Sequence, residues 1–244
     1  MRIAIVSDAH SNIEGLTAVL RHAEAGAPLD GVWCLGDLVG YGPDPGAVIA
    51  ELRRRHVTAV AGNHDRAVAG LMDVDEFNPA AASAALWTRE QLSVYEREFV
   101  AGLPLTHVAS DFTLVHGSLR DPVWEYLLSP EQADAHFALQ TTRYGLIGHS
   151  HLTFWVEERP HAAPAFHRAD DGRTLELGER RLILNPGSCG QPRDGDPRAA
   201  YLLYDDAAAA VIWRRVEYDV AATQRKMRDA RLHPWLIERL ALGE

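Results

Sequence analysis

Cysteine is almost absent from this sequence of 244 residues, which contains only Cys34 and Cys189. Cys34 lies inside the apolar run Val32–Leu35, where a thiol in the hydrophobic core is expected. Cys189 follows a Gly-Ser turn, and a position near a functional site stays open for it. We expect no disulfide between the two, because the thiols of a cytosolic chain are kept reduced.

Long hydrophobic runs are also absent, and none approaches the length of a membrane span. Met1 and Arg2 lead directly into Ile3–Val6, which predicts a buried strand rather than a cleavable leader. There is no internal repeat, linker or low-complexity tract. The sequence therefore predicts one domain over residues 1–244, in the cytoplasm and without a membrane partner.

Blocks of basic residues are missing as well, and the formal net charge is −10. This argues against a nucleic-acid partner, because contacts with a phosphate backbone need clustered cations. It does not exclude a phosphorylated substrate, since bound divalent ions would dominate the local field. Apolar residues make up 47% of the chain and charged residues 24%, which allows an ordinary globular core.

Strand and helix patterns alternate at the start of the chain. Short apolar runs predict strands at Ile3–Val6, Val32–Leu35 and Val57–Ala61. Between them, helices are expected over Ile13–Ala25 and Ala47–Arg55. This alternation predicts βαβ units and a largely parallel sheet.

Farther along, residues Arg66–Val100 have a helical pattern. Strands are predicted at Phe112–Val115 and Gly145–Ile147, with a helix near Pro130–Leu139 between them. After Leu152 short strands separated by turns predict an antiparallel meander. Its expected strands are Phe154–Glu157, Arg181–Leu184, Ala200–Tyr204 and Val211–Val216.

The end of the chain predicts a C-terminal helical extension over residues 219–244. Val220–Arg231 has the pattern of an amphipathic helix, and Pro234 limits its continuation. The apolar residues of Leu232–Leu242 either pack on the core or build a homo-oligomer, and the sequence leaves both open.

Candidate metal ligands follow five of the predicted strands. The segments are Asp8-Ala9-His10, Gly36-Asp37, Gly62-Asn63-His64-Asp65, His116-Gly117 and Gly148-His149-Ser150-His151. Carboxylate and amide oxygens mixed with imidazoles suit a pair of divalent ions such as Mn, Fe or Zn. In an open α/β sheet, ligands bind beyond the carboxyl ends of the strands, so we expect these segments to converge on one rim.

Taken singly, most of these segments are weak signals. An Asp-x-His pair is usually a chance surface pair, Gly-Asp is a common turn, and an Asx turn explains Gly-Asn-His-Asp. Taken together, they hold five of the 12 histidines of the chain, each directly beyond a predicted strand. The combination favours a metal site over five unrelated turns.

The order DxH, GDxxG, GNHD, H and GHxH resembles the calcineurin-like metallophosphoesterase superfamily. The resemblance runs from Met1 to about Arg193 and includes Asn185-Pro186-Gly187-Ser188. It is closest to small prokaryotic phosphodiesterases of the group that also includes diadenosine-polyphosphate hydrolases. It implies an α/β fold, a four-layer α/β/β/α sandwich of two mixed sheets packed face to face.

The resemblance also implies two divalent ions, with Mn expected first and Zn, Fe, Ni or Co open. The ligands implied for one ion are Asp8, His10, Asp37 and His151. The ligands implied for the other are Asp37, Asn63, His116 and His149. Asp37 then bridges the ions, and a hydroxide held between them attacks phosphorus in line with the leaving oxygen.

Four neighbouring residues are given roles on the same basis. His64 resembles the family's non-ligand histidine, which protonates the leaving alkoxide or stabilises its charge. Asp65 either orients that imidazole or caps the following helix. Asn12 is expected to cap a helix, with a contact to a substrate phosphate as the alternative. Arg193, beside the Asn185–Ser188 turn, is a candidate phosphate contact.

The sequence departs from the protein Ser/Thr phosphatases of this superfamily, which have an Arg shortly after Gly-Asp and a Glu after Gly-Asn-His. Here Leu38-Val39-Gly40-Tyr41 and Asp65 follow instead. Loss of a bidentate Arg favours a small phosphodiester or nucleotide anhydride over a dianionic monoester. Residues 67–100 are a candidate lid, with Trp87 and Tyr95 either over the site or in the core.

The sequence leaves two alternatives to a phosphodiesterase open. One is a phosphomonoesterase or phosphoprotein phosphatase. The other is a protein-binding scaffold, like the retromer subunit that has this fold but has lost key catalytic residues. A scaffold predicts damaged motifs, whereas every expected ligand and His64 are present here.

Overall fold

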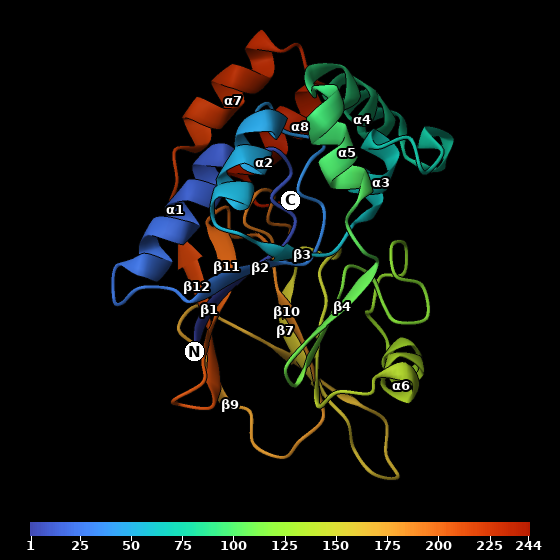
Figure 1. The fold of residues 1–244 in the computed structure, drawn as a ribbon, viewed down its shortest axis with the longest axis vertical. Coiled ribbons are helices and arrows are strands. Elements are labelled where there is room, and N and C mark those ends of the chain that lie inside the picture. Colours follow the sequence, from blue (N-terminus) through green and yellow to red (C-terminus); the bar gives the residue numbers. More distant parts are fainter.

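Two six-stranded mixed sheets form the centre of the protein, as a computed structural model of residues 1–244 describes it (Figure 1). The strand order is β3-β2-β1-β11-β12-β9 in the first sheet and β4-β5-β6-β10-β7-β8 in the second. Helices flank both sheets, so the predicted fold class is confirmed.

The strands of the two sheets come from different parts of the chain. The first sheet contains β1 (Arg2–Val6), β2 (Gly31–Cys34), β3 (Thr58–Ala59), β9 (Thr174–Glu176), β11 (Ala199–Asp205) and β12 (Ala210–Val216). The second contains β4 (Thr106–Ala109), β5 (Phe112–Val115), β6 (Tyr144–Leu146), β7 (Thr153–Glu157), β8 (Ala165–Arg168) and β10 (Leu182–Pro186). Strands β1, β2 and β3 pair in parallel, as the βαβ pattern predicts.

The prediction of one antiparallel meander after Leu152 is wrong. Strands β7, β8 and β10 join the second sheet, whereas β11 and β12 form an antiparallel pair in the first. Strand β10 is also parallel to β6 on one side and antiparallel to β7 on the other. Strands β10 and β11 are buried over nearly their whole length. Their apolar pattern therefore indicates a strand without indicating which sheet it joins.

The helices lie outside the sheets and beyond the strand ends. They are α1 (Ile13–Glu24), α2 (Pro45–Arg54), α3 (Asn63–Val68), α4 (Pro79–Gln91), α5 (Val94–Ala101), α6 (Pro130–Leu139), α7 (Val220–Asp229) and α8 (Pro234–Glu238), with short 3₁₀ turns η1 (Val74–Glu76) and η2 (Arg239–Ala241). In Figure 1, α6 lies alone beside the second sheet, and the other helices gather around the first sheet and the upper end of the molecule.

The core has layers that follow the period-two alternation of the strands. Ile3 and Ile5 of β1 point between the two sheets, whereas Ala4 and Val6 point toward the helices on the other face. Full burial of an Ile side chain stabilises the fold by about 1.5–3 kcal/mol. Both cysteines are buried and free, so the expectation of no disulfide is confirmed.

The C-terminal segment packs on the rest of the chain. Met227, Leu236 and Ile237 are buried in one cluster with Tyr41 and the alanines of α4. Residues 232–242 thus pack on the core, with Trp235 and Leu242 as their exposed large apolar side chains.

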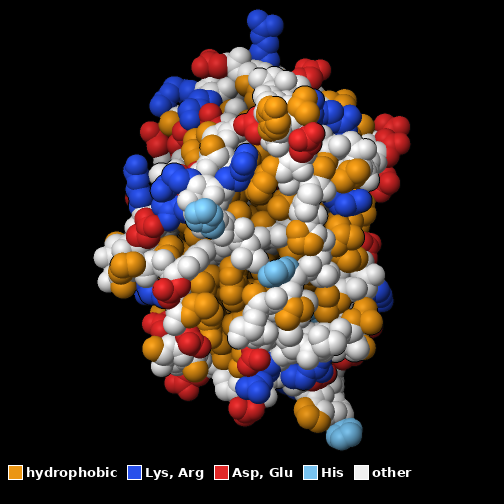
Figure 2. Space-filling view, in the orientation of Figure 1, with side chains coloured by type: hydrophobic (Ala, Val, Ile, Leu, Met, Phe, Trp, Pro, Cys, Tyr) orange, Lys and Arg blue, Asp and Glu red, His pale blue; other side chains and the backbone are white.

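The face of the molecule seen in Figure 2 carries acidic and basic side chains interspersed around its edge, with hydrophobic side chains across its middle. No helix in the structure combines the length and the apolar character needed to cross a membrane.

Candidate metal centre

The ends of five strands bring the predicted ligands together at one rim of the two sheets. Asp8 and His10 follow β1, Asp37 follows β2, and Asn63 begins α3 after β3. The other three ligands are His116, which follows β5, and His149 and His151, which follow β6. Six of the seven predicted ligands, together with His64, form three buried groups in which the possible ligand atoms lie within 4.8 Å of one another. The groups are Asp8 with His10 and His151, His10 with Asp37 and His64, and Asp37 with His116 and His149.

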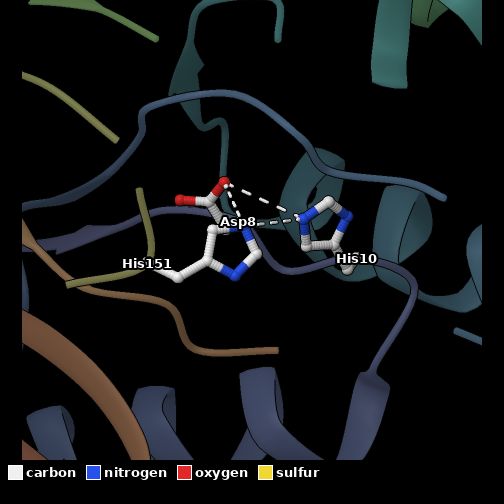
Figure 3. Close-up of side chains that lie close together, drawn as sticks. All are labelled: Asp8, His10 and His151. Carbon is white, nitrogen blue, oxygen red and sulfur yellow. Dashed lines mark hydrogen bonds and ion pairs between the residues drawn. The ribbon is translucent and has the colours of Figure 1, made fainter. Parts of the chain in front are cut away.

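The first group is arranged around the carboxylate of Asp8 (Figure 3). Nε2 of His151 lies 3.2 Å from Asp8 Oδ1, and Nε2 of His10 lies 3.8 Å from the same oxygen. The two Nε2 atoms are 3.2 Å apart. One carboxylate oxygen and two ring nitrogens thus point at a common centre, a geometry that suits a divalent ion.

Asp37 lies between this group and a second one. Its Oδ2 is 3.6 Å from His10 Nε2 and 3.4 Å from His116 Nε2, while its Oδ1 accepts a hydrogen bond from the backbone N–H of His64 at 2.9 Å. On the far side, His116 Nε2 is 3.2 Å from Asn63 Oδ1 and 3.1 Å from His149 Nδ1. The position of Asp37 fits a carboxylate shared by two ions.

Each of the four histidines directs one ring nitrogen at a backbone carbonyl. The pairs are His10 Nδ1 with Val39 at 3.3 Å, His116 Nδ1 with Leu35 at 2.8 Å, His151 Nδ1 with Gln191 at 2.5 Å and His149 Nε2 with Trp124 at 3.2 Å. A carbonyl only accepts, so the nitrogen facing it carries the proton and the opposite nitrogen presents a lone pair to the centre. His149 therefore faces the centre through Nδ1, unlike the other three.

Charge reinforces this arrangement. Burial opposes ionisation of Asp8 and Asp37, but nearby histidines, chiefly His151 and His116, outweigh it and hold the pKa of both carboxyl groups well below the usual range. Burial also lowers the pKa of His116, but the charges of Asp37 and Asp8 outweigh it and raise this pKa to about 9. Two buried carboxylates thus create a demand for positive charge that divalent ions satisfy.

For His149, by contrast, the effect of burial outweighs the attraction of the carboxylates. Together with the charge of His116, burial lowers the pKa of His149 to about 3, so its ring is neutral at physiological pH. Neutral imidazole is the form that binds a metal ion.

The backbone at the ligands is bent sharply. Five of the seven ligands have positive φ angles, namely Asp8 (54°), His10 (44°), Asp37 (52°), His149 (64°) and His151 (60°). The left-handed region costs a non-glycine residue roughly 1–2 kcal/mol. Such strain persists where the surrounding structure fixes the chain, and it gathers at functional sites.

A cavity of about 200 Å³ lies beside Asp37, Asn63, His149 and His151. Its wall includes four aromatic side chains, those of Tyr41, Phe77, Trp124 and Tyr126. Tyr126 stacks on His149, with ring centroids 4.0 Å apart and an interplanar angle of 15°. These residues cannot be identified from the sequence, because neither the carbonyl of Trp124 nor the ring of Tyr126 belongs to a recognisable motif.

His64 lies in the same cavity, between Tyr41 and Phe77. Its Nδ1 is buried against Gly40 without a hydrogen-bond partner, which leaves Nε2 for the cavity. Burial lowers the pKa of His64 to about 4. Asp65 does not contact this ring, because its oxygens accept from the backbone N–H groups of Gly62 and Val39. Of the two roles predicted for Asp65, the structure therefore has the helix cap.

The two candidate substrate contacts differ in position. Asn12 caps α1, where its Oδ1 accepts from Gly15 N–H and Thr223 Oγ1 and its Nδ2 donates to the Gly190 carbonyl. Its side chain is thus engaged within the protein, in the helix cap that the sequence predicts first. Arg193 lines the cavity, with its guanidinium 5.7 Å from the ring centre of Tyr41.

Residues 67–100 reach the cavity only through Glu76, Phe77 and Asn78. Trp87 packs with the cluster that contains α8, as the core alternative predicts. Tyr95 is 79% exposed and lies in neither predicted place. The aromatic residue that this segment contributes to the site is therefore Phe77, whose ring contacts both His64 and Trp124.

Comparison with known proteins agrees with this site. Residues 1–207 match the family model of the calcineurin-like phosphoesterase superfamily domain. The chain is 42% identical to a metallophosphoesterase of Sphaerobacter thermophilus of known structure, with a TM-score of 0.90 and coverage of 100% of this chain and 99% of the other. It is 35% identical to an uncharacterised protein of Methanocaldococcus jannaschii, over 99% of this chain and 98% of that protein.

A hypothetical protein of Pyrococcus horikoshii shares the fold, with a TM-score of 0.81 at 20% identity over 100% of this chain and 98% of the other. The family match covers all seven candidate ligands and His64. The chain therefore belongs to the calcineurin-like phosphoesterase superfamily and is a metal-dependent phosphoesterase.

Proposed function

We propose that this protein is a two-metal phosphodiesterase that hydrolyses small nucleotide diesters or anhydrides in the cytoplasm. The observation that carries the proposal is the set of four buried imidazoles, each with one nitrogen on a backbone carbonyl and the other within a group of candidate ligand atoms that includes Asp8 or Asp37. This arrangement supports two adjacent ions. One would be held by Asp8, His10, Asp37 and His151, and the other by Asp37, Asn63, His116 and His149.

The donors are oxygen and imidazole nitrogen, with no thiolate among them, which suits Mn and also accommodates Fe, Zn, Ni or Co. We propose Mn as the physiological ion. When bound, such ions polarise the phosphoryl group and lower the pKa of water, so that a nucleophile forms near neutral pH.

The small number of cationic side chains in the cavity favours a diester over a dianionic monoester. Arg193 is the only Lys or Arg that lines it, and its Nε and Nη2 both donate to Gln191 Oε1. Its guanidinium fork is thus partly occupied, whereas recognition of a dianionic monoester uses a free bidentate Arg. A diester or an internal anhydride phosphate places less charge there.

His64 is suited to the leaving group. Burial keeps its ring neutral, and Nε2 faces the cavity. In this proposal, His64 hydrogen-bonds the leaving oxygen and stabilises the charge that develops on it, while Asp37 fixes the start of α3 by accepting from the His64 N–H.

The test compares bis(p-nitrophenyl) phosphate with p-nitrophenyl phosphate, using metal-stripped protein resupplied with Mn. We expect Mn-dependent turnover of the diester well above that of the monoester. A preference for the monoester would replace the proposal with a phosphomonoesterase. Two bound ions without turnover of either compound would contradict it.

A further inference from the structure

We infer that the site extends into a distal subsite that binds the base of a nucleotide, in an aromatic cavity beside the metal centre. This inference deepens the proposed function and rests on it for the identity of the substrate. The cavity has a volume of about 310 Å³, within the range of small-molecule pockets. Its wall includes Leu128, Leu152, Phe154, Phe166 and Arg168.

Three chain segments connect this cavity to the metal centre. In Tyr126–Leu128, His151–Leu152 and Arg193–Asp194, the first residue lines the metal cavity and the last lines the aromatic one. Consecutive Cα atoms are about 3.8 Å apart, so the two cavities lie on either side of the same short segments. One elongated molecule can occupy both.

The first of these segments forms the path between them. Tyr126 is 42% exposed, Leu127 is 2% exposed and Leu128 is 51% exposed. Alternation of this kind places Tyr126 and Leu128 on the same side of the segment. One face of the Tyr126 ring is covered by His149, so its exposed surface continues toward Leu128 as an apolar strip that starts at a metal ligand.

The lining determines the kind of group that fits. Phe154 and Phe166, on neighbouring strands β7 and β8, have ring centroids 5.9 Å apart and planes tilted by 31°, and they give the cavity an aromatic wall against which a planar ring can pack. Arg168 adds a donor at the rim. This combination favours a heteroaromatic ring with acceptor atoms over an alkyl or sugar group.

Asp194 points to an amino-bearing base. Its side chain is 9% exposed, and its Oδ2 accepts from Thr153 Oγ1 and pairs with Arg215. Its other oxygen, Oδ1, is buried without a hydrogen-bond partner. A buried acceptor without a donor is unfavourable, so an exocyclic amino group at this end of the cavity would satisfy it. Adenine, guanine and cytosine carry such a group.

The test measures binding of adenosine 5′-monophosphate and of ribose 5-phosphate to the Mn-loaded protein by calorimetry. We expect the nucleotide to bind more tightly, and Phe166→Ala to weaken its binding about tenfold, as for loss of one stacking aromatic. Binding of ribose 5-phosphate should not change. Arg168→Gln, at a side chain that is 72% exposed, should also weaken the nucleotide alone and does not threaten folding.

The matched control is Val108→Ala, an exposed apolar residue on β4 at the opposite edge of the same sheet. Equal affinities of the wild type for the two ligands, or equal losses for both in Phe166→Ala, would overturn the subsite. Turnover of methyl p-nitrophenyl phosphate, which carries no base, separates the two proposals. If the wild type binds the nucleotide through Phe166 but hydrolyses no diester, the subsite stands and the proposed function fails.

Discussion

Gly62 lies directly against Asp37 in the metal centre. Gly62 precedes α3 with φ −96° and ψ 179°, an extended conformation that alanine adopts without strain. A Cβ at this position would lie 2.1 Å from Asp37 Oδ1 and 2.6 Å from the Asp37 backbone nitrogen. The substitution Gly62→Ala therefore acts on the carboxylate between the two ligand groups rather than on the backbone of Gly62.

The expected effect is large. Ordinary contacts of a Cβ begin at 3.4 Å, so the carboxylate must move by more than 1 Å. Metal sites tolerate ligand displacements of about 0.2 Å, and misplacement by about 1 Å can lower a rate about 100-fold. We expect Gly62→Ala to lower kcat on bis(p-nitrophenyl) phosphate about 100-fold and to lose at least one of two ions. Overpacking should also lower the free energy of unfolding by about 1–3 kcal/mol.

Gly102→Ala is the matched control. Gly102 ends α5 with φ −80°, and the nearest atoms to an added Cβ are 3.4 and 3.6 Å away. Both variants are compared with the wild type by turnover, by metal content from inductively coupled plasma mass spectrometry, and by urea titration. If Gly62→Ala binds two ions and its turnover is within threefold of that of the wild type, the role assigned to Asp37 is refuted.

His64, His136 and Leu236 provide tests in three other regions. His64→Ala should lower kcat on the diester by about 10²–10⁴-fold with the metal content unchanged, and full turnover would remove His64 from the chemistry. Burial lowers the pKa of His136 to about 4, so the unfolded state binds protons first and stability falls as the pH drops from about 6.5 to 4. His136→Asn removes the titrating ring but retains an acceptor for the N–H of Leu119. Between pH 7 and pH 5, urea titrations should therefore show a fall in the free energy of unfolding that is about 2 kcal/mol smaller in this variant than in the wild type. An equal fall in both proteins would contradict this. Leu236 is fully buried, so Leu236→Ala should lower the free energy of unfolding by about 2–5 kcal/mol, and a loss below about 0.5 kcal/mol would show that α8 is not part of the core.

The sequence predicts buried elements better than edges. Strands β1 and β5 are short, mainly apolar and almost entirely buried, and the apolar run in the sequence gives their positions. Strands β4, β8 and β9, which lie at sheet edges, were not predicted from the sequence. Strand β4 is almost entirely exposed, so no alternation marks it, and only its pairing with β5 identifies it. An edge strand is stabilised by pairing with its neighbour, and the residue pattern of the strand itself need not show that pairing.

The residues of the site also differ in whether the sequence reveals them. Side chains such as His149 and Asn63 are visible in motifs, and the structure brings them within reach of one another. The backbone carbonyl of Trp124, which sets the tautomer of His149, has no sequence signature because every residue has a carbonyl. The same holds for the ring of Tyr126, which reaches the site through the path of its loop.

The backbone conformation of the ligands explains why the site lies where it does. The parallel pairing of β1 and β2 continues past the strand ends, where Asp8 N–H donates to the Gly36 carbonyl and His10 N–H to the Asp37 carbonyl, both at 3.0 Å. These bonds hold Asp8, His10 and Asp37 in the left-handed region, although each conformation is unfavourable alone. The sheet therefore fixes three ligands before any ion arrives, and ion binding does not have to order them. Because the same hydrogen bonds join both loops, a change that loosens one strand end should weaken ligands of both ions together.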